Sequence, residues 1–195
     1  MKKTILLLGG ARSGKSRFAQ ELAQKITDKV LFVATATAGD EDMRLRILKH
    51  KQKRPASWRT LEVTTDVGKH IERELSDSKL VIVDCVTLLA NNVFCRYEDY
   101  QFETIDEPVL EKELVSEINN LLECVRHVSA SFILVSNEVG LGIVPDNRMG
   151  RLYRDLLGKA NQMLAQNADE VYLMVAGIPL AVKPALTDSH DNSSG

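Results

Sequence analysis

The sequence predicts an α/β protein with a mostly parallel sheet that is covered by helices on both faces. Short apolar runs alternate along the chain with segments of helical periodicity, which is typical of strand–helix–strand units. Two last apolar runs, at 170–176 and 178–183, flank Gly177 and predict a C-terminal hairpin. Right-handed crossovers place the loops after the parallel strands along one edge, so residues in these loops should converge.

Each expected element is a periodic run that ends at a turn signal. The parallel strands are expected at 4–8, 29–34, 79–84 and 131–136, and 58–63 is expected to be a short strand or an extended connection. The helices are expected at 17–25, 41–53, 66–76, 109–128 and 147–167. Asp40 can cap the second helix, and Arg54-Pro55 ends it because the residue before a proline disfavours helical geometry. The stretch 91–108 is irregular and rich in aromatic and acidic residues, and we expect a long loop there.

Length and composition indicate one domain over 1–183 and a polar, disordered tail over 184–195. The net charge of -2 argues against a generic nucleic-acid surface, which would be strongly basic. Apolar runs are too short for a membrane span, and the N-terminal run is too short for a signal peptide. Three cysteines at unrelated spacings indicate reduced thiols in a cytoplasmic protein rather than disulfides or a zinc site.

The first twenty residues carry a phosphate-binding motif. Residues 9–16, Gly-Gly-Ala-Arg-Ser-Gly-Lys-Ser, match G-x-x-x-x-G-K-[ST] and lie between an expected strand and an expected helix. Backbone N–H groups of such a loop, and the positive end of the helix, attract phosphate. Lys15 can reach the β- and γ-phosphates, and the Ser16 hydroxyl can hold Mg²⁺. The alternative, a glycine-rich turn with a solvated lysine, leaves the Gly-Lys-Ser order unexplained.

Three further positions could take part in chemistry, and each has a plain structural alternative. Asp84 ends an apolar strand, where P-loop proteins keep a second Mg²⁺-directed acid, and this role is favoured over a helix cap or a structural hydrogen bond after the strand. His50 lies among cations that disfavour imidazole protonation and attract phosphate, but composition alone favours an incidental histidine on a solvated basic helix. Asn137 and Glu138 follow a strand beside glycines that allow close backbone approach, or they form an ordinary loop.

Several stretches stand in an order that is typical of one enzyme family. They are the loop 9–16, Arg46-Ile…His50…Arg54-Pro55, Trp58-Arg-Thr-x-Glu62, the run Ser-Asn-Glu-Val-Gly-Leu-Gly-Ile-Val-Pro-Asp-Asn-Arg at 136–148, Leu152-Tyr-Arg-Asp155 and Asn161. Together they resemble the bifunctional adenosylcobinamide kinase/adenosylcobinamide-phosphate guanylyltransferase family of cobalamin synthesis. The similarity runs over about 3–183, and the run at 136–148 is far more specific than the P-loop.

The resemblance implies a RecA-like P-loop fold, a homotrimer and two successive reactions. A nucleoside triphosphate, ATP or GTP, first phosphorylates adenosylcobinamide. In the second reaction, a histidine takes GMP from GTP, and pyrophosphate is released. Adenosylcobinamide phosphate then attacks this guanylylated histidine, which gives adenosylcobinamide-GDP. The histidine of the family aligns with His50, and Ser16 and Asp84 would hold Mg²⁺. The implied nucleotide contacts are Gly9, Gly10, Ala11, Arg12, Ser13, Gly14, Lys15, Ser16, Ala34, Thr35, Ala36, Lys51, Gln52, Lys53, Arg54, Glu62 and Asp84.

Two other functions stay open on the residues alone. The chain could be a P-loop kinase of another small alcohol with no nucleotidyl transfer, in which case His50 is structural. It could also be a nucleotide-dependent binding module that catalyses no reaction. The resemblance favours the bifunctional enzyme and a catalytic His50, and a covalent guanylyl label would separate that hypothesis from the others.

Overall fold

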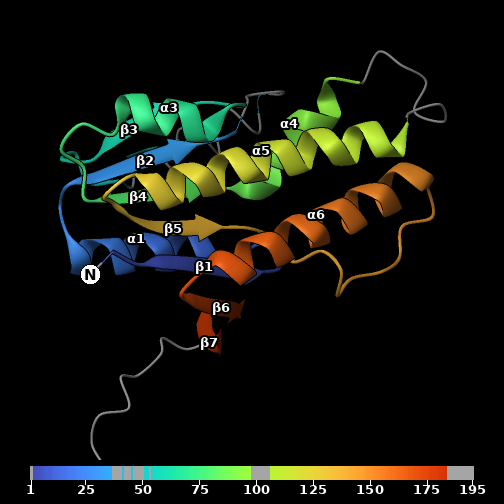
Figure 1. The fold of residues 1–195 in the computed structure, drawn as a ribbon. Coiled ribbons are helices and arrows are strands. Elements are labelled where there is room, and N and C mark those ends of the chain that lie inside the picture. Colours follow the sequence, from blue (N-terminus) through green and yellow to red (C-terminus); the bar gives the residue numbers. More distant parts are fainter. Residues whose placement is uncertain are drawn as a thin grey trace, which may run out of the picture.

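A seven-stranded sheet forms the middle layer of the molecule (Figure 1). The computed structural model describes residues 2–36, 41, 45, 51, 52, 54–97 and 106–183. The strands are ordered β3-β2-β4-β5-β1-β6-β7, and β7 alone among them runs antiparallel to its neighbour. Their bounds are β1 Thr4–Gly9, β2 Val30–Ala34, β3 Arg59–Glu62, β4 Leu80–Asp84, β5 Ser131–Val135, β6 Glu170–Val175 and β7 Ile178–Lys183.

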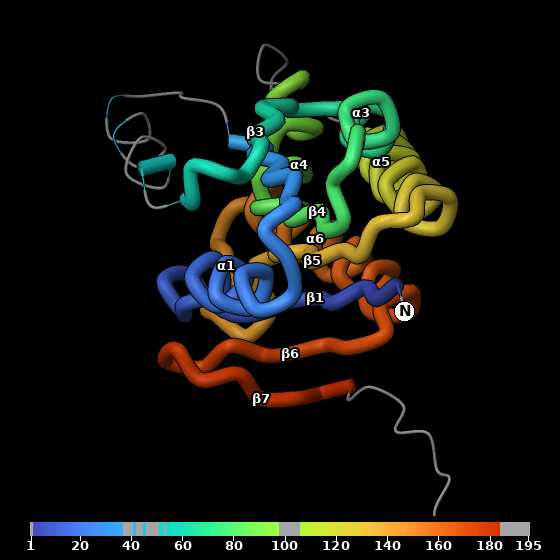
Figure 2. Tube along the Cα trace, turned by 90° about the vertical axis from the view of Figure 1, so that its left-hand side faces the viewer, coloured from blue at the N-terminus to red at the C-terminus, as the bar shows by residue number. Residues whose placement is uncertain are grey.

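Helices cover both faces of this sheet, as the near-continuous apolar strands require. Figure 2 shows α1 on one side of the stacked strands and α3 and α5 on the other. The helices are α1 Lys15–Ile26, α3 Val67–Glu74, α4 Val86–Cys95, α5 Glu107–His127 and α6 Arg148–Asn167. Successive strand side chains point to opposite faces, so Ile5 and Leu7 pack toward α1 while Leu6 packs with the other helices. The fold therefore has two apolar layers, one on each side of the sheet.

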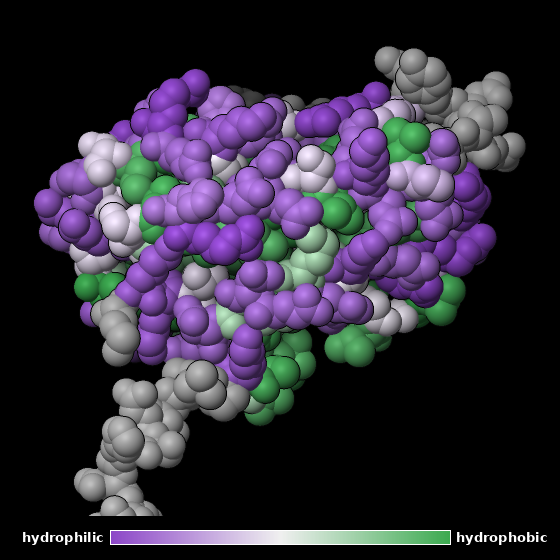
Figure 3. All heavy atoms as spheres, in the orientation of Figure 1, coloured by the Kyte–Doolittle hydropathy of each residue, from purple (hydrophilic) through white to green (hydrophobic). Residues whose placement is uncertain are grey.

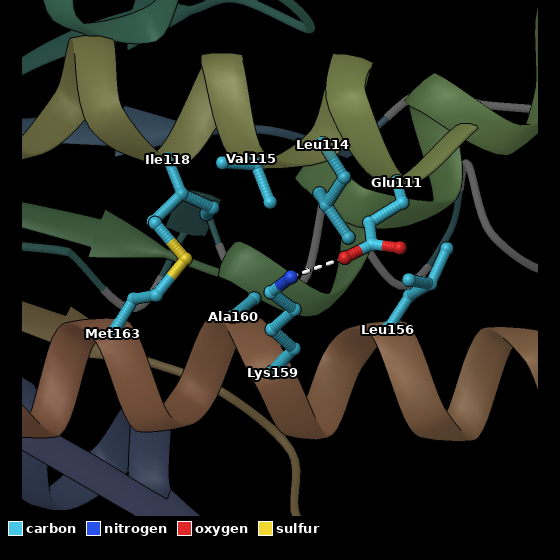
Figure 4. A pocket seen from close by; sticks show the side chains of 8 residues that line it. All are labelled: Glu111, Leu114, Val115, Ile118, Leu156, Lys159, Ala160 and Met163. Carbon is cyan, nitrogen blue, oxygen red and sulfur yellow. Dashed lines mark hydrogen bonds and ion pairs between the residues drawn. The ribbon is translucent and has the colours of Figure 1, made fainter. Parts of the chain in front are cut away.

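Helices α5 and α6 pack against each other through small and branched apolar side chains. Figure 4 shows Leu114 and Ile118 of α5 directed toward Ala160 and its neighbours on α6. At the edge of this contact, Lys159 pairs with Glu111. An ion pair that is this exposed adds only a fraction of a kcal/mol, about 0.2–1, so buried apolar area holds the two helices together.

The N-terminus of α3 is capped by a side chain from α5. Asp66, just before α3, has a positive φ of 50° and makes no side-chain cap; its carboxylate pairs with Lys69 instead. The two carboxylate oxygens of Glu117 accept hydrogen bonds from the N–H groups of Asp66 (3.0 Å) and Val67 (2.9 Å). Glu117 is buried, so the cap also fixes α3 on α5.

Replacement of Glu117 by alanine is expected to lower the free energy of unfolding by about 2–3 kcal/mol, because two N–H groups lose a charged acceptor. The matched control is Glu123→Ala, an exposed position of the same helix, which should change it by less than about 0.5 kcal/mol. Urea denaturation followed by circular dichroism measures both. Equal effects of the two variants would contradict the cap.

The expected parallel strands and the C-terminal hairpin are confirmed. The expected loop at 91–108 is wrong in its first part, because α4 continues to Cys95, and in its last part, because α5 begins at Glu107. The buried residues Val86, Leu89 and Val93 follow helical spacing and pack α4 on the core.

Some expectations fall outside the described part of the chain. These are residues 98–105 of the expected loop, the tail 184–195 and most of the helix expected at 41–53. Within that last segment, Glu41, Leu45, Lys51 and Gln52 are described, and they are helical. Among the described helices, none has the length and apolar character needed to cross a membrane.

The strand order determines the fold class. Strand β1 leads into the loop 9–16, β4 ends in Asp84, and β5 lies between them. In the ladders, Val135 pairs with both Leu7 and Asp84, and Ala34 pairs with Asp84 on its other side. One strand therefore separates the P-loop strand from the strand with the terminal acid, which is the RecA-like arrangement of P-loop proteins.

Candidate active site

Residues 9–16 form a tight turn between β1 and α1 that only glycine permits at two positions. Gly9 and Gly14 have φ values of 148° and 95°. A Cβ at Gly9 would lie 2.6 Å from the Met174 carbonyl oxygen, and one at Gly14 would lie 3.1 Å from the Gly177 Cα. The β6–β7 hairpin thus packs directly against the turn and supports its shape.

The side chain of Lys15 lies inside this turn. Its Nζ donates hydrogen bonds to the carbonyl oxygens of Gly9 (2.8 Å) and Gly10 (2.7 Å) and approaches Ser13 Oγ (3.3 Å). Burial lowers the pKa of Lys15 below its ordinary value, and nearby Asp84 opposes this shift. The fold therefore holds a mostly desolvated ammonium group where phosphate oxygens would meet it.

A cavity of about 440 Å³ lies beside the turn, at the carboxyl edge of the sheet. Its volume is in the range of small-molecule sites, and its place is where open α/β sheets bind ligands. The residues expected from the sequence that line it are Ala11, Arg12, Ser13, Gly14, Lys15, Ser16, Ala34, Ala36, Arg54 and Asp84. Most of the expected nucleotide contacts are thus brought together.

Three expected contacts do not line the cavity themselves but form hydrogen bonds with residues that do; they are Gly9, Gly10 and Thr35. Gly9 and Gly10 supply the carbonyl groups that hold Lys15. Thr35 is fully buried; its hydroxyl donates to the Cys85 carbonyl oxygen (2.7 Å) and accepts from the Cys85 N–H (2.9 Å). Thr35 therefore ties the end of β2 to the end of β4.

The expected contacts of the basic segment are only partly described. Lys51 Nζ lies 3.0 Å from Glu62 Oε1, and both side chains of this ion pair are exposed. Gln52 is exposed as well and does not line the cavity. His50 and Lys53 lie outside the described residues.

Arg54 adds a second cation to the cavity wall. Its guanidinium carbon stands 3.7 Å from the centroid of the Phe32 ring, an arrangement that favours a cation electrostatically. Burial lowers the pKa of Arg54, and Asp84 and Glu62 oppose the shift. Its Nε is buried without a hydrogen-bond partner among the described residues. Stacking therefore fixes the group in a place where it can meet an anionic ligand.

Part of the cavity wall was not assigned to the site from the sequence. It consists of Arg17, Cys85, Leu88 and Val135, whereas Asn137, which also lines the cavity, was a candidate from the sequence. Arg17 follows the P-loop motif directly, so the motif itself could have indicated its place. Cys85 and Leu88 lie around the start of α4, a helix not expected from the sequence. Burial raises the pKa of the Cys85 thiol to about 11, so it acts as a neutral, weakly polar wall.

The donor groups at the cavity suit a magnesium ion. The Ser16 hydroxyl and the Asp84 carboxylate belong to the same wall, although they come from α1 and β4. Mg²⁺ prefers hard oxygen ligands and commonly combines one or two protein groups with the phosphates of a substrate. The residues present therefore fit the ion that the P-loop motif implies.

Lys15 reaches the cavity from the start of α1, which follows β1, and Asp84 reaches it from the end of β4. Because β1 and β4 flank β5, this arrangement defines a nucleotide-binding P-loop protein. Over residues 5–182 the chain matches the family described as cobinamide kinase / cobinamide phosphate guanyltransferase, and it belongs to that family.

Curated relatives match nearly the whole chain. The bifunctional adenosylcobalamin biosynthesis protein CobU of Escherichia coli is 39% identical over 180 residues, which cover 92% of this chain and 99% of that protein. The bifunctional adenosylcobalamin biosynthesis protein CobP of Pseudomonas aeruginosa is 41% identical over 179 residues, with 91% and 96% covered.

The solved structures that match are more distant in sequence than these relatives. The RadB recombinase matches with a TM-score of 0.48 at 14% identity, covering 88% of this chain and 73% of its own. A second solved structure, an ATPase domain, matches with a TM-score of 0.46 at 14% identity, covering 88% and 69%.

Proposed function

We propose that this chain is an adenosylcobinamide kinase and an adenosylcobinamide-phosphate guanylyltransferase. The observation that supports this most is that Lys15, Ser16 and Asp84 line one cavity in a chain of the cobinamide kinase / cobinamide phosphate guanyltransferase family. A P-loop supplies phosphate binding for either reaction, because both use a nucleoside triphosphate. The two activities would then share the cavity.

In the kinase step, the hydroxyl oxygen of the cobinamide amino-alcohol attacks the γ-phosphorus of ATP or GTP. The new oxygen–phosphorus bond replaces the bond to the β–γ bridging oxygen, the nucleoside diphosphate leaves, and the hydroxyl proton passes to solvent. Lys15 and the N–H groups of the loop neutralise the phosphate oxygens. Mg²⁺ bound to Ser16 and Asp84 would add charge neutralisation at the same oxygens.

In the transfer step, we propose His50 as the nucleophile at the α-phosphorus of GTP, with pyrophosphate as the leaving group. A phosphate oxygen of adenosylcobinamide phosphate then displaces the histidine, giving adenosylcobinamide-GDP. Neighbouring cations favour the neutral imidazole that such an attack needs. Two cations that follow His50 in the sequence support this role. Arg54 lines the cavity, and Lys51 forms an ion pair with Glu62, whose strand partner Ala34 also lines the cavity.

Assays on the purified protein test the proposal. With cobinamide and γ-labelled ATP or GTP, the label should pass to cobinamide phosphate, and with further GTP the product should be the GDP derivative plus pyrophosphate. Turnover with another small alcohol but not with cobinamide would support the alternative kinase. Nucleotide binding without turnover of either substrate would support a binding module.

We also propose that the chain assembles as a homotrimer, which the family resemblance implies. The edge strand β7 exposes Ile178 (69%), Leu180 (58%) and Val182 (61%), and Figure 3 shows hydrophobic, green side chains at the lower edge of the molecule. An exposed apolar edge strand is normally covered in the native assembly. Light scattering should give three times the 21.7 kDa mass of one chain, and a monomer mass would contradict the proposal.

A further inference from the structure

The main chain of Asn137 is held by side chains from two helices. Its N–H donates to Thr87 Oγ1 of α4 (2.6 Å), and its carbonyl oxygen accepts from Asn161 Nδ2 of α6 (3.0 Å). Both side chains are buried. In addition, the Tyr153 hydroxyl of α6 donates to the Thr87 carbonyl oxygen (2.9 Å), which joins the two helices. Asn137 therefore cannot shift without breaking buried hydrogen bonds.

Within the part of the chain that the structure describes, the side-chain amide of Asn161 has one polar atom with a hydrogen-bond partner and one without. Its Oδ1 is buried and has no hydrogen-bond partner among the described residues. A buried oxygen without a hydrogen-bond partner lowers the free energy of unfolding. The hydrogen bond from Asn161 Nδ2 to the Asn137 carbonyl oxygen offsets this cost, so the asparagine acts on the backbone of the cavity wall.

Asn137 stands between Lys15, which the P-loop motif directs at phosphate, and Asp84, the acid at the end of β4. It follows β5, which separates β1 from β4, and its half-buried side chain lines the cavity together with Lys15 and Asp84. The next residue, Glu138, donates its N–H to the Gly9 carbonyl oxygen (3.0 Å), which fixes this segment against the P-loop.

The neighbouring carboxylate cannot take the same role. Glu138 Oε1 accepts a hydrogen bond from the Gly140 N–H (2.7 Å), so the side chain is turned toward its own loop. A carboxylate would also repel a phosphate, whereas the amide of Asn137 offers a neutral donor. The geometry thus singles out Asn137 at the end of β5.

We propose that the side-chain amide of Asn137 donates a hydrogen bond to the terminal phosphate of the bound triphosphate, and that Thr87 and Asn161 are its positioning residues. This rests on the proposed function, in which a triphosphate occupies the cavity. A P-loop holds the inner phosphates through its backbone, so the terminal phosphate extends past Lys15 toward Asp84. That direction passes the wall that Asn137 forms.

The test compares binding of a non-hydrolysable GTP analogue with binding of GDP by calorimetry. Asn137→Ala should raise the Kd of the triphosphate analogue by roughly ten- to a hundredfold, because one hydrogen bond to a charged group is lost. It should raise the Kd of GDP by less than about threefold. Equal weakening of both ligands, or of neither, would overturn the inference. Absence of nucleotide binding by the wild-type protein would instead overturn the proposed function.

The positioning role is tested with a matched pair of variants at Thr87. Thr87→Val keeps the shape and removes the hydroxyl, so it should show the same selective loss for the triphosphate. Thr87→Ser keeps the hydroxyl and should bind both ligands within about twofold of wild type. A Thr87→Val protein that is less stable in urea but has an unchanged ratio of the two affinities would contradict positioning. If that variant fails to fold, Asn137→Ala still tests the phosphate contact.

Discussion

Replacement of Lys15 by alanine is expected to lower both the phosphorylation of cobinamide and the guanylyl labelling by roughly a hundred- to a thousandfold. Both reactions develop charge on phosphate oxygens, and Lys15 is the cation that the P-loop holds among its own carbonyl groups. Single-turnover assays with γ-labelled and α-labelled GTP measure the two rates. Wild-type kinase activity in this variant would contradict the assignment of the site.

The loss should not come from unfolding. Without Lys15, the Gly9 carbonyl oxygen keeps its bond from the Glu138 N–H, and the Gly10 carbonyl oxygen keeps its bond from the Ser13 N–H. Removing a buried ammonium group also removes its desolvation cost, which is what lowers the pKa of Lys15. Lys25→Ala, at the exposed end of the same helix, is the matched control and should keep both rates within about twofold.

Replacement of His50 by alanine is expected to lower guanylyl transfer by roughly 10⁴- to 10⁶-fold while phosphorylation of cobinamide continues. The proposed covalent intermediate forms on this imidazole, and the kinase step requires no such group. Incubation with α-labelled GTP followed by a denaturing gel shows the intermediate as an acid-labile label. A label of wild-type intensity on the His50→Ala protein would rule out this nucleophile.

A second histidine provides the control for this experiment. His127 lies at the exposed end of α5, so His127→Ala should take up the label as the wild-type protein does. Taken together with Lys15→Ala, the variants distinguish one shared cavity from two separate sites. A shared cavity requires that the lysine variant lose both activities and the histidine variant only one.

Local patterns were sufficient for most of the fold. Strands that are buried on both faces need continuous apolar runs, and such runs are visible in β1, β4 and β5 without any tertiary information. The P-loop was equally visible, because the positive φ values of Gly9 and Gly14 restrict those positions to glycine.

Helix α4 was not predicted, for a physical reason. It begins at Val86, directly after β4, with no turn residue of the usual kind between them. Val86, Thr87 and Val93 are β-branched, and such residues have low helix propensity. Burial of one helical stripe against the core overrides that propensity, and burial is a property of the folded chain.

The sequence by itself thus determined the α/β class, the P-loop and the family resemblance, because these depend on residue types at fixed local spacings. The convergence of the loops after the parallel strands was also expected from the sequence, but the tertiary structure alone decided which side chains hold Asn137 in place. Asn137, Thr87 and Asn161 are far apart in the chain, and they come together because β5 lies between β1 and β4. Hydrophobic periodicity does not encode strand order, which follows from how the sheet and helices pack as a whole. The hydrogen bonds that tie Asn137 to Thr87 and Asn161 are therefore visible only in the fold.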